Sequence, residues 1–256
     1  MGSTWIVIVN YRTADLAIDT LRSLSSQVAD LGGGRVVVID NASGDGSVEK
    51  IVAAIEREIW SAWVTVMPLE RNGGFSYGNN AGIREALASA DQANYVMLLN
   101  PDTVARKGAI KALADFMDAH PSAGIAGSQL ENTDGDVDCS AHTFPSPLSE
   151  LDGGARLGVL SRLLHRYAVS SPPKAVAHSC DWVSGASMII RRRVFEDIGL
   201  MDENYFLYFE EVDFCRRAHL ADWECWYVPE SRVMHLEGAS TGIRVVAKRR
   251  AKYWYD

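Results

Sequence analysis

Two patterns of hydrophobicity alternate along the first hundred residues, and they constrain the fold more than any other feature of the sequence. Continuous apolar runs at 5–9 and 36–39 are typical of strands that are buried on both faces, and 64–67 and 95–99 are predicted as a third and a fourth strand. Between them, apolar residues recur every three or four positions, as in a helix with one buried face. This order predicts an α/β fold, with a mainly parallel central sheet covered by helices on both faces.

The predicted helices are identified by their apolar positions. These are Ala17, Leu21, Leu24 and Val28; Val48, Ile51, Val52, Ile55 and Ile59, with Ser47 as the cap; and Ile110, Leu113, Ala114 and Met117. A further helix is expected within 76–90.

The second half of the sequence is less regular, and prolines make loops dominant between about residue 131 and residue 180. One segment there has an apolar helical face beside three arginines, which fits a lid or surface helix and also a segment that rests on a membrane. Its residues are Leu157, Leu160, Leu164 and Ala168, with Arg156, Arg162 and Arg166. Further strands are predicted at 182–191, 226–229 and 232–234, and helices from Arg193 and over 210–220.

The composition excludes several classes of protein. The chain has 256 residues, 47% of them hydrophobic, which suits one large globular domain. A formal net charge of −8 argues against nucleic-acid binding. No apolar run approaches the roughly 18–20 residues of a membrane span, and no signal peptide is expected. The four cysteines lack C-x-x-C spacing, so we expect no disulfide framework or zinc site, and a cytoplasmic location.

The end of the sequence, residues 243–256, is a basic segment. It fits a solvated helix or tail, and also a peripheral contact with anionic lipid at the inner face of the membrane, where each basic residue contributes about 1 kcal/mol. The residues concerned are Arg244, Lys248, Arg249, Arg250 and Lys252.

Polar residues follow each of the four predicted strands. In a parallel sheet these strand ends share one rim, where ligands bind. The segments are Asn10-Tyr11-Arg12, Asp40-Asn41-Ala42-Ser43, Glu70-Arg71-Asn72-Gly73-Gly74 and Asn100-Pro101-Asp102. The sequence contains neither G-x-G-x-x-G after the first strand nor G-x-x-x-x-G-K-[ST], which argues against dinucleotide and P-loop chemistry.

The rim residues suit a nucleotide that carries a diphosphate. Asp40 either forms a local turn or accepts hydrogen bonds from a ligand, and Tyr11 offers a face on which a base can stack. The glycines after Asn72 permit close approach of a ligand to the backbone. Asp102 either caps the next helix or holds a divalent metal against the diphosphate leaving group.

Three acids, Glu210, Glu211 and Asp213, lie at the start of the predicted helix 210–220. Crowded carboxylates raise one another's proton affinity, which suits a general base; a solvated acidic helix start is the alternative. His235 follows a predicted strand, where its imidazole can complete the metal shell that Asp102 begins.

With these residues in place, the chain resembles the family 2 glycosyltransferases of the GT-A fold, and within them bacterial rhamnosyltransferase-like enzymes of cell-surface polysaccharide synthesis. The motifs that carry the resemblance are Val9-Asn10-Tyr11, Asp40-Asn41-Ala42-Ser43, Asn72-Gly73-Gly74-Phe75 with Gly78-Asn79-Asn80, Leu98-Leu99-Asn100-Pro101-Asp102, Trp182-Val183-Ser184-Gly185-Ala186, Phe209-Glu210-Glu211-Val212-Asp213 with Arg216, and Val233-Met234-His235 through Ser240. Each motif alone is weak evidence for the family, whereas the whole set in this order is highly specific for it.

The resemblance implies a role for each of these positions. Asn10, Tyr11 and Asp40 would hold the nucleotide, with Asn72 and Gly73 near the donor. Asn100 and Asp102 replace the family's Asp-x-Asp, so Asp102 and His235 would bind Mg²⁺ or Mn²⁺. Trp182 and Gly185 would shape the acceptor side. Glu211 matches the family's base, and because it is one methylene longer than the usual aspartate, Asp213 or Glu210 stays open as the base.

The implied activity is an inverting transfer from a dTDP- or UDP-sugar, with L-rhamnose favoured, to a saccharide or lipid-linked acceptor. Residues 1–130 would form the nucleotide-sugar half and 131–242 the acceptor half of one domain, 1–256. The chain ends where relatives often continue, so we expect a shortened form, or one that lacks a membrane-proximal tail. The alternatives are a catalytically weak sugar-nucleotide-binding subunit and a nucleotidyltransferase; the latter would normally show a basic, Gly-rich loop after the first strand.

Overall fold

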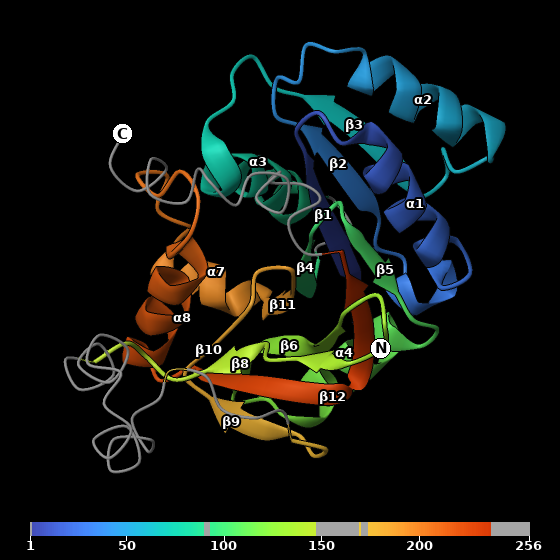
Figure 1. Cartoon of the computed structure of the whole chain (residues 1–256). Helices are drawn as coiled ribbons and strands as arrows, with labels where there is room; N and C mark the ends of the chain where they lie inside the picture. Colours follow the sequence, from blue (N-terminus) through green and yellow to red (C-terminus); the bar gives the residue numbers. More distant parts are fainter. Residues whose placement is uncertain (1, 90–92, 147–168, 170–173, 237–256) are drawn as a thin grey trace, which may run out of the picture.

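A twisted sheet with helices on both faces forms the centre of the molecule (Figure 1). The computed structural model describes residues 2–89, 93–146, 169 and 174–236. The elements are β1 (Thr4–Asn10), α1 (Ala14–Ser25), η1 (Val28–Leu31), β2 (Val36–Asp40), α2 (Ser47–Arg57), β3 (Val64–Pro68), α3 (Gly74–Ala88), β4 (Tyr95–Leu99), β5 (Thr103–Ala105), α4 (Ala109–Ala119), β6 (Ala123–Glu131), β7 (Val137–Asp138), β8 (Ala141–His142), β9 (His178–Cys180), β10 (Trp182–Val183), β11 (Ser187–Arg191), α7 (Arg192–Ile198), α8 (Glu210–Leu220) and β12 (Glu224–His235).

The strand order in the main sheet is β3-β2-β1-β4-β11-β6-β12-β5. The first four strands are parallel, as the alternation of strands and helices predicted. β11 is antiparallel to both β4 and β6, and β12 is parallel to β6 and antiparallel to β5. β7 and β9 pair with β6 and β12, and β8 and β10 form a separate small sheet. The carboxyl ends of β1, β2, β3 and β4 therefore share one rim.

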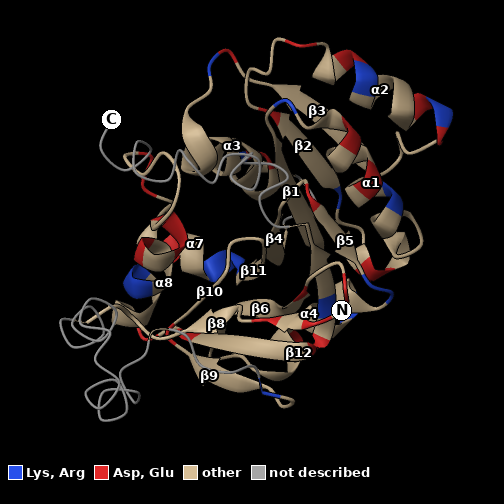
Figure 2. Cartoon of the chain, in the orientation of Figure 1, with Lys and Arg blue, Asp and Glu red and all other residues tan. Residues whose placement is uncertain are grey.

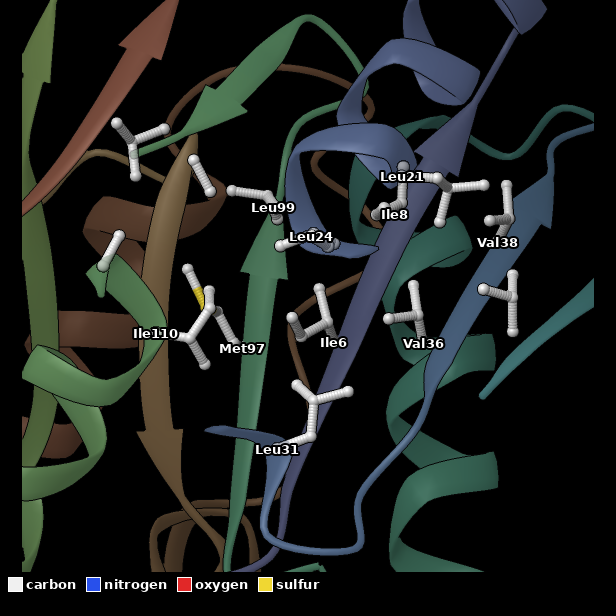
Figure 3. Close-up of a cluster of buried hydrophobic side chains, with 14 of the residues drawn as sticks. Ile6, Ile8, Leu21, Leu24, Leu31, Val36, Val38, Met97, Leu99 and Ile110 are labelled. Carbon is white, nitrogen blue, oxygen red and sulfur yellow. The ribbon is translucent and has the colours of Figure 1, made fainter. Parts of the chain in front are cut away.

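Alternate residues of β1 divide the core into two layers. Ile6 and Ile8 point to the side covered by α1, α2 and α4, where they pack with residues such as Leu21 (Figure 3). Trp5 and Val7 belong to the layer on the other side, under α3, α7 and α8. Figure 1 shows α1 and α2 on one side of the parallel strands and α3 on the other. Both faces are covered, which explains why the strands read as continuous apolar runs.

Charged residues are found mainly on the helices and loops, most visibly on α1 and α2, whereas the central strands carry few of them (Figure 2). No helix in the described part of the chain has the length and apolar character that a membrane span requires. None of the four cysteines, all of which lie in the described part of the chain, forms a disulfide, and Cys180 Sγ lies 4.0 Å from Cys225 Sγ across the β9–β12 pair.

Several local predictions are wrong. Val28 lies in η1 rather than α1, and Ile59 lies beyond the end of α2, 82% exposed with a φ of 59°. Val52 is exposed because α2 buries only one narrow stripe. Ser47 is the first residue of α2, not its cap.

The strand predictions need similar correction. Predicted strand 182–191 is interrupted by a turn that separates β10 from β11. The two late strands are one strand, β12, with an irregularity between Val228 and Arg232. The short strand β5 was not predicted. The segment around Leu157 and the basic end 243–256 lie outside the described residues.

Two glycines allow α3 to pack closely on β1. A methyl group on Gly82 would lie 2.5 Å from Val7 Cγ1, and one on Gly78 would lie 2.7 Å from Val9 Cγ1. Because Gly74, the first residue of α3, lies beside the rim, this packing also fixes how α3 meets the site.

We predict that Gly82→Ala lowers the free energy of unfolding by about 1–3 kcal/mol, because overpacking outweighs the gain of about 1 kcal/mol in helix propensity. Urea denaturation measures the change. The same substitution in a Val7→Ala background should cost clearly less, since the clashing methyl groups are gone. Equal costs in both backgrounds would show that the close approach is not the cause.

Candidate active site

The loop that follows β4 is fixed from three sides. Asn100 N–H donates to Ala186 O at 3.0 Å, which ties the loop to the start of β11. The Thr20 hydroxyl lies 2.7 Å from the carbonyl oxygens of both Pro101 and Thr103. The Thr103 hydroxyl donates to Asn100 O at 2.7 Å. The backbone that carries Asp102 is therefore held by α1 and β11 before any ligand binds.

Asp102 and His235 lie side by side because β5 pairs with the end of β12. In this antiparallel pair His235 is opposite Thr103, and Leu236 N–H donates to Asp102 O at 2.9 Å. The two side chains meet with His235 Nε2 3.4 Å from Asp102 Oδ1. The alternative that Asp102 caps the next helix is wrong, since α4 begins only at Ala109 with Gly108 as its cap.

The residues at this point fit a divalent metal that is shared with a diphosphate. Asn100 Oδ1 is buried and accepts no hydrogen bond from the residues that the structure describes. Within those residues, no group of three His, Cys, Asp or Glu side chains is placed to enclose an ion. Mg²⁺ is commonly held by one or two carboxylates together with substrate phosphates, so an incomplete protein shell is what such a metal requires.

A buried hydrogen-bond network joins the ends of β1 and β2. Asp40 Oδ1 accepts from Asn10 Nδ2 at 2.7 Å and from the Ser43 hydroxyl at 2.6 Å, and its Oδ2 accepts from Ser43 N–H at 3.0 Å. Asn10 Oδ1 in turn accepts from Thr13 N–H at 3.2 Å. Asp40 therefore forms a local turn, as one of the two interpretations predicted. Its contact with a nucleotide stays a prediction.

The backbone around this network adopts unusual conformations. Arg12 and Ala42 have positive φ values of 59° and 58°, which are uncommon for residues other than glycine and cluster at functional sites. Tyr11 is 39% exposed, and the Arg12 guanidinium lies 5.1 Å from its ring centroid. An exposed ring next to a fixed cation is suited to stacking on a flat ligand.

Asn41, to which the sequence analysis gave no role, organises the loop after β3. Its Nδ2 donates to Asn72 Oδ1 at 2.9 Å and to Gly74 O at 3.0 Å. Asn72 Oδ1 also accepts from Gly74 N–H at 3.0 Å. Asn72 and Gly73 thus lie at the rim, next to the end of β2, where the resemblance placed the donor.

The turn between β10 and β11 meets the starts of two helices. A methyl group on Gly185 would lie 3.5 Å from the ring of Phe75 and 3.8 Å from Glu211 Cβ. Phe75 is at the start of α3 and Glu211 at the start of α8. Gly185, predicted on the acceptor side, is therefore brought together with the predicted base.

The three acids of α8 have different surroundings. Glu210 is buried, and burial together with the smaller effect of the neighbouring Glu211 charge raises the pKa of Glu210 to about 8. Burial also raises the pKa of Glu211, whose residue as a whole stays partly exposed. In both residues Oε2 is buried and accepts no hydrogen bond within the described part of the chain. A solvated helix start, the alternative interpretation, is wrong for Glu210.

Asp213, by contrast, is held in a structural ion pair. Its Oδ2 accepts from Arg217 Nε at 2.8 Å, and the same guanidinium donates to Ile198 O at 2.9 Å and Leu200 O at 3.0 Å. Proton transfer from a substrate would have to compete with this ion pair. Within the described residues Glu211 has no such ion pair, which favours it over Asp213 as a proton acceptor.

Trp182, the other residue predicted on the acceptor side, lies in the small β8–β10 sheet. Its ring stacks on His142 with centroids 4.1 Å apart, and its Nε1–H donates to Thr143 O at 3.0 Å. Burial lowers the pKa of His142, which favours the neutral imidazole in this stack.

Two further positions were not identified from the sequence as supports of the site. Thr20 is a polar residue within the apolar stripe of α1, and that break in the pattern was the available signal. Asn80 is buried in α3, where its amide donates to Met201 O at 2.8 Å and accepts from Met201 N–H at 3.1 Å. It also donates to Glu203 Oε1 at 2.9 Å. Asn80 fixes the loop that leads to α8.

Sequence comparison connects the chain with known proteins. Residues 2–255 match the family described as "Glycosyltransferase like family 2". N-acetylglucosaminyl-diphospho-decaprenol L-rhamnosyltransferase of Mycobacterium tuberculosis is 32% identical over 218 residues, 81% of this chain and 68% of that protein. The hexosyltransferase Agl10 of Haloferax volcanii, of low-salt glycan biosynthesis, is 30% identical over 83% of this chain and 60% of its own length.

Solved structures agree on the fold. GalNAc-T7 with UDP, GalNAc and Mn²⁺ superposes with a TM-score of 0.67 at 15% identity, over 93% of this chain and 45% of that one. The mannosyltransferase PcManGT of Pyrobaculum calidifontis, in complex with GDP-Man and Mn²⁺, gives 0.62 at 15% identity over 100% of this chain and 65% of its own. The chain spans less than two thirds of each of these two structures. The chain is thus a glycosyltransferase of family 2, with the GT-A fold.

Proposed function

We propose that this protein transfers a sugar from a nucleoside-diphosphate donor to a saccharide or lipid-linked acceptor in cell-surface polysaccharide synthesis, with inversion at the anomeric carbon. The juxtaposition of Asp102 and His235, 3.4 Å apart beside the buried Asn100 Oδ1, is the observation that carries this proposal. It provides a place for a metal-bound diphosphate at the rim where the four parallel strands end.

The donor in this proposal is a dTDP- or UDP-sugar, with L-rhamnose favoured. The network of Asn10 and Asp40 presents Tyr11 for stacking on the base, and Asn72 and Gly73 border the sugar. The support for rhamnose comes from relatives, among them the dTDP-rhamnosyl transferase RfbF of Shigella flexneri, which is 26% identical over 93% of this chain.

Asp102 and His235 would hold Mg²⁺ or Mn²⁺, with Asn100 as a neutral neighbour. When bound, such a metal stabilises the negative charge that develops on the diphosphate as it leaves. A carboxylate that is positioned before the donor arrives does not have to reorganise during the reaction, which is the origin of most electrostatic catalysis. The hydrogen bonds of Thr20 and Thr103 provide this positioning.

Glu211 acts as the base in the proposed mechanism. Its carboxylate takes the proton from an acceptor hydroxyl, and that oxygen attacks the anomeric carbon on the face opposite the departing diphosphate, so the configuration inverts. Gly185 borders the space for the acceptor beside Glu211, since a methyl group there would lie within van der Waals contact of Phe75 and Glu211. Trp182 forms part of the neighbouring wall. Glu210 is the alternative base; Asp213 is less suited because of its ion pair with Arg217.

The proposed place of action is the cytoplasmic side of the membrane, with peripheral contact and without a nucleic-acid partner. Support comes from the relative in Mycobacterium tuberculosis, whose name includes a diphospho-decaprenol acceptor.

The direct test incubates the protein with a panel of nucleotide sugars and Mn²⁺ or Mg²⁺, with and without lipid-linked acceptors, and measures the released nucleotide. We expect a nucleoside diphosphate, stimulated by an acceptor. Release of pyrophosphate would instead indicate a nucleotidyltransferase, and binding without turnover across the panel would indicate a sugar-nucleotide-binding subunit.

Asp102→Asn should weaken metal-dependent donor binding by at least about a hundredfold, because the neutral amide loses the charge that attracts the metal. Calorimetric titration with a nucleoside diphosphate, with and without Mn²⁺, measures this loss. Asp115→Asn, on the exposed surface of α4, is the matched control and should bind normally. Undiminished Mn²⁺-dependent binding to the Asp102 variant would contradict the assignment.

Glu211→Gln should leave donor binding intact and lower kcat by about 10²–10⁴-fold, the usual contribution of a general base. Asp213→Asn should lower Tm by weakening the ion pair with Arg217, yet retain most of the turnover. Stopped or continuous assays of diphosphate release compare the variants. Turnover near the unmodified level in the Glu211 variant would show that another residue is the base.

Glu210→Gln should change the pH dependence of stability. The pKa of Glu210 is about 8 in the folded protein against 4.5 for an exposed glutamate, so the folded state binds this proton more tightly. Its stabilising effect is present below about pH 4.5 and is lost as the pH rises toward 8. Urea denaturation between pH 5 and pH 8 should show a smaller decline for the variant. Parallel pH profiles for both proteins would argue against a buried, protonated Glu210.

A further inference from the structure

An exposed aromatic loop precedes the acids of α8. We define the aromatic loop as residues 205–209, Tyr-Phe-Leu-Tyr-Phe. Phe206 is 54% exposed and Phe209 52%, and Tyr205 is also exposed. Single exposed apolar residues are ordinary on a protein surface, but several in one short loop beside a proposed active site point to a binding surface.

The backbone of the aromatic loop is strained. Tyr208 and Phe209 have consecutive positive φ values of 71° and 69°. For residues with bulky side chains this region costs about 1–2 kcal/mol each, and glycine would avoid that cost. Strain of this kind persists where the surrounding structure fixes it, and it clusters at ligand-binding sites.

The aromatic loop is attached to the donor side of the rim. Phe75 N–H donates to Phe206 O at 2.7 Å. Gly74 has a φ of 86°, and a methyl group there would lie 2.2 Å from Phe206 O, so the two backbones touch. At the other end, Phe209 is the cap of α8, and its carbonyl accepts from Asp213 N–H at 2.9 Å. The aromatic side chains are therefore presented by a fixed backbone.

We propose that Phe206 and Phe209 form a platform on which a sugar ring of the acceptor stacks. This inference rests on the proposed function, because it takes Glu211 as the base. The attacking hydroxyl belongs to a sugar ring and must reach Glu211, two residues after Phe209 in the sequence. A pyranose has an apolar C–H face, and a flat aromatic ring covers it at small conformational cost.

The surroundings favour a saccharide over a lipid tail. The residues directly before the loop, Asp202, Glu203 and Asn204, are polar and exposed. Asp202 accepts from Asn204, and Glu203 accepts from Asn80 and Arg84, yet these groups stay exposed and can also bond to sugar hydroxyls. A polyprenyl chain would displace water from these charged groups and offer no hydrogen bond in return. A small aromatic surface with polar neighbours is the usual composition of a site for a polar ligand with one apolar face.

The test compares Phe206→Leu and Phe209→Leu with the unmodified protein, since leucine stays apolar and lacks the flat face. The acceptor is N-acetylglucosaminyl diphosphate on a short, water-soluble prenyl chain. We expect the KM for this acceptor to rise about fivefold to tenfold in each variant, which corresponds to the loss of one stacking contact. The KM for the donor and the rate of diphosphate release without acceptor should stay unchanged. Phe209→Tyr, which keeps a flat ring, should have an acceptor KM within about twofold of that of the unmodified protein.

Ile59→Ala is the matched control. Ile59 is also exposed and has a φ of 59°. It precedes β3 and therefore lies near the amino ends of the parallel strands, away from the rim formed by their carboxyl ends. It should leave all kinetic parameters unchanged.

The outcomes separate the inference from the function on which it rests. If the unmodified protein transfers sugar and the leucine variants keep a normal acceptor KM, the platform is wrong and the function stands. If the loss appears only with a long prenyl chain, the loop binds lipid, which also overturns the platform. If the unmodified protein cleaves no donor, the proposed function fails. In that case the platform is tested by saturation-transfer NMR with methyl N-acetylglucosaminide in the presence of UDP and Mn²⁺. Equal saturation transfer to the sugar C–H protons in the unmodified protein and in the leucine variants would overturn the platform.

Discussion

The pairing of β12 with its neighbours is the interaction on which the rest of the site depends. This strand is parallel to β6 and antiparallel to β5 and β9. Its last residue, His235, meets Asp102 only because the register with β5 places it opposite Thr103. Since side chains alternate along a strand, a shift by one residue would turn the imidazole to the other face. The proposed metal site is therefore a consequence of strand register, and the hydrogen bonds of that strand pair are also the support of the site.

Most of the parallel half could be predicted from the sequence, because β1, β2 and β4 are almost wholly buried and each helix is buried on one face; β3, at the edge of the sheet, is only partly buried. Tyr95–Leu99 and Glu210–Leu220 have the bounds that their patterns predicted. The prediction failed where tertiary contacts decide the local structure. β5 is too short for any pattern, and its partner is distant in sequence. Ile59 is apolar at helical spacing, but the chain leaves the helix before reaching it.

In the candidate site, too, the sequence predicted residues that follow strands or belong to motifs, and it did not predict which partners they contact. Strand ends and family motifs led to Asp102, Glu211 and His235, and the structure brings Asp102 to His235, and Glu211 to Gly185. The sequence could not show which of the three acids of α8 is engaged elsewhere, because the ion pair of Asp213 depends on where Arg217 is directed. Asn41 and Asn80 belong to motifs of the resemblance, but their supporting roles were not predicted. Their amides bond to backbone atoms of distant loops, and no spacing rule along the chain reveals such partners.

The two side chains of the proposed metal site are far apart in the sequence, one in the loop after β4 and one at the end of β12, and this affects how the protein is made. During synthesis the parallel strands and their helices leave the ribosome before β12 does. Because a domain folds as a unit, Asp102 lacks its histidine until β12 docks between β6 and β5. Metal-dependent donor binding would thus develop only after β12 has been made, and a growing chain without β12 could not hold a reactive sugar nucleotide tightly.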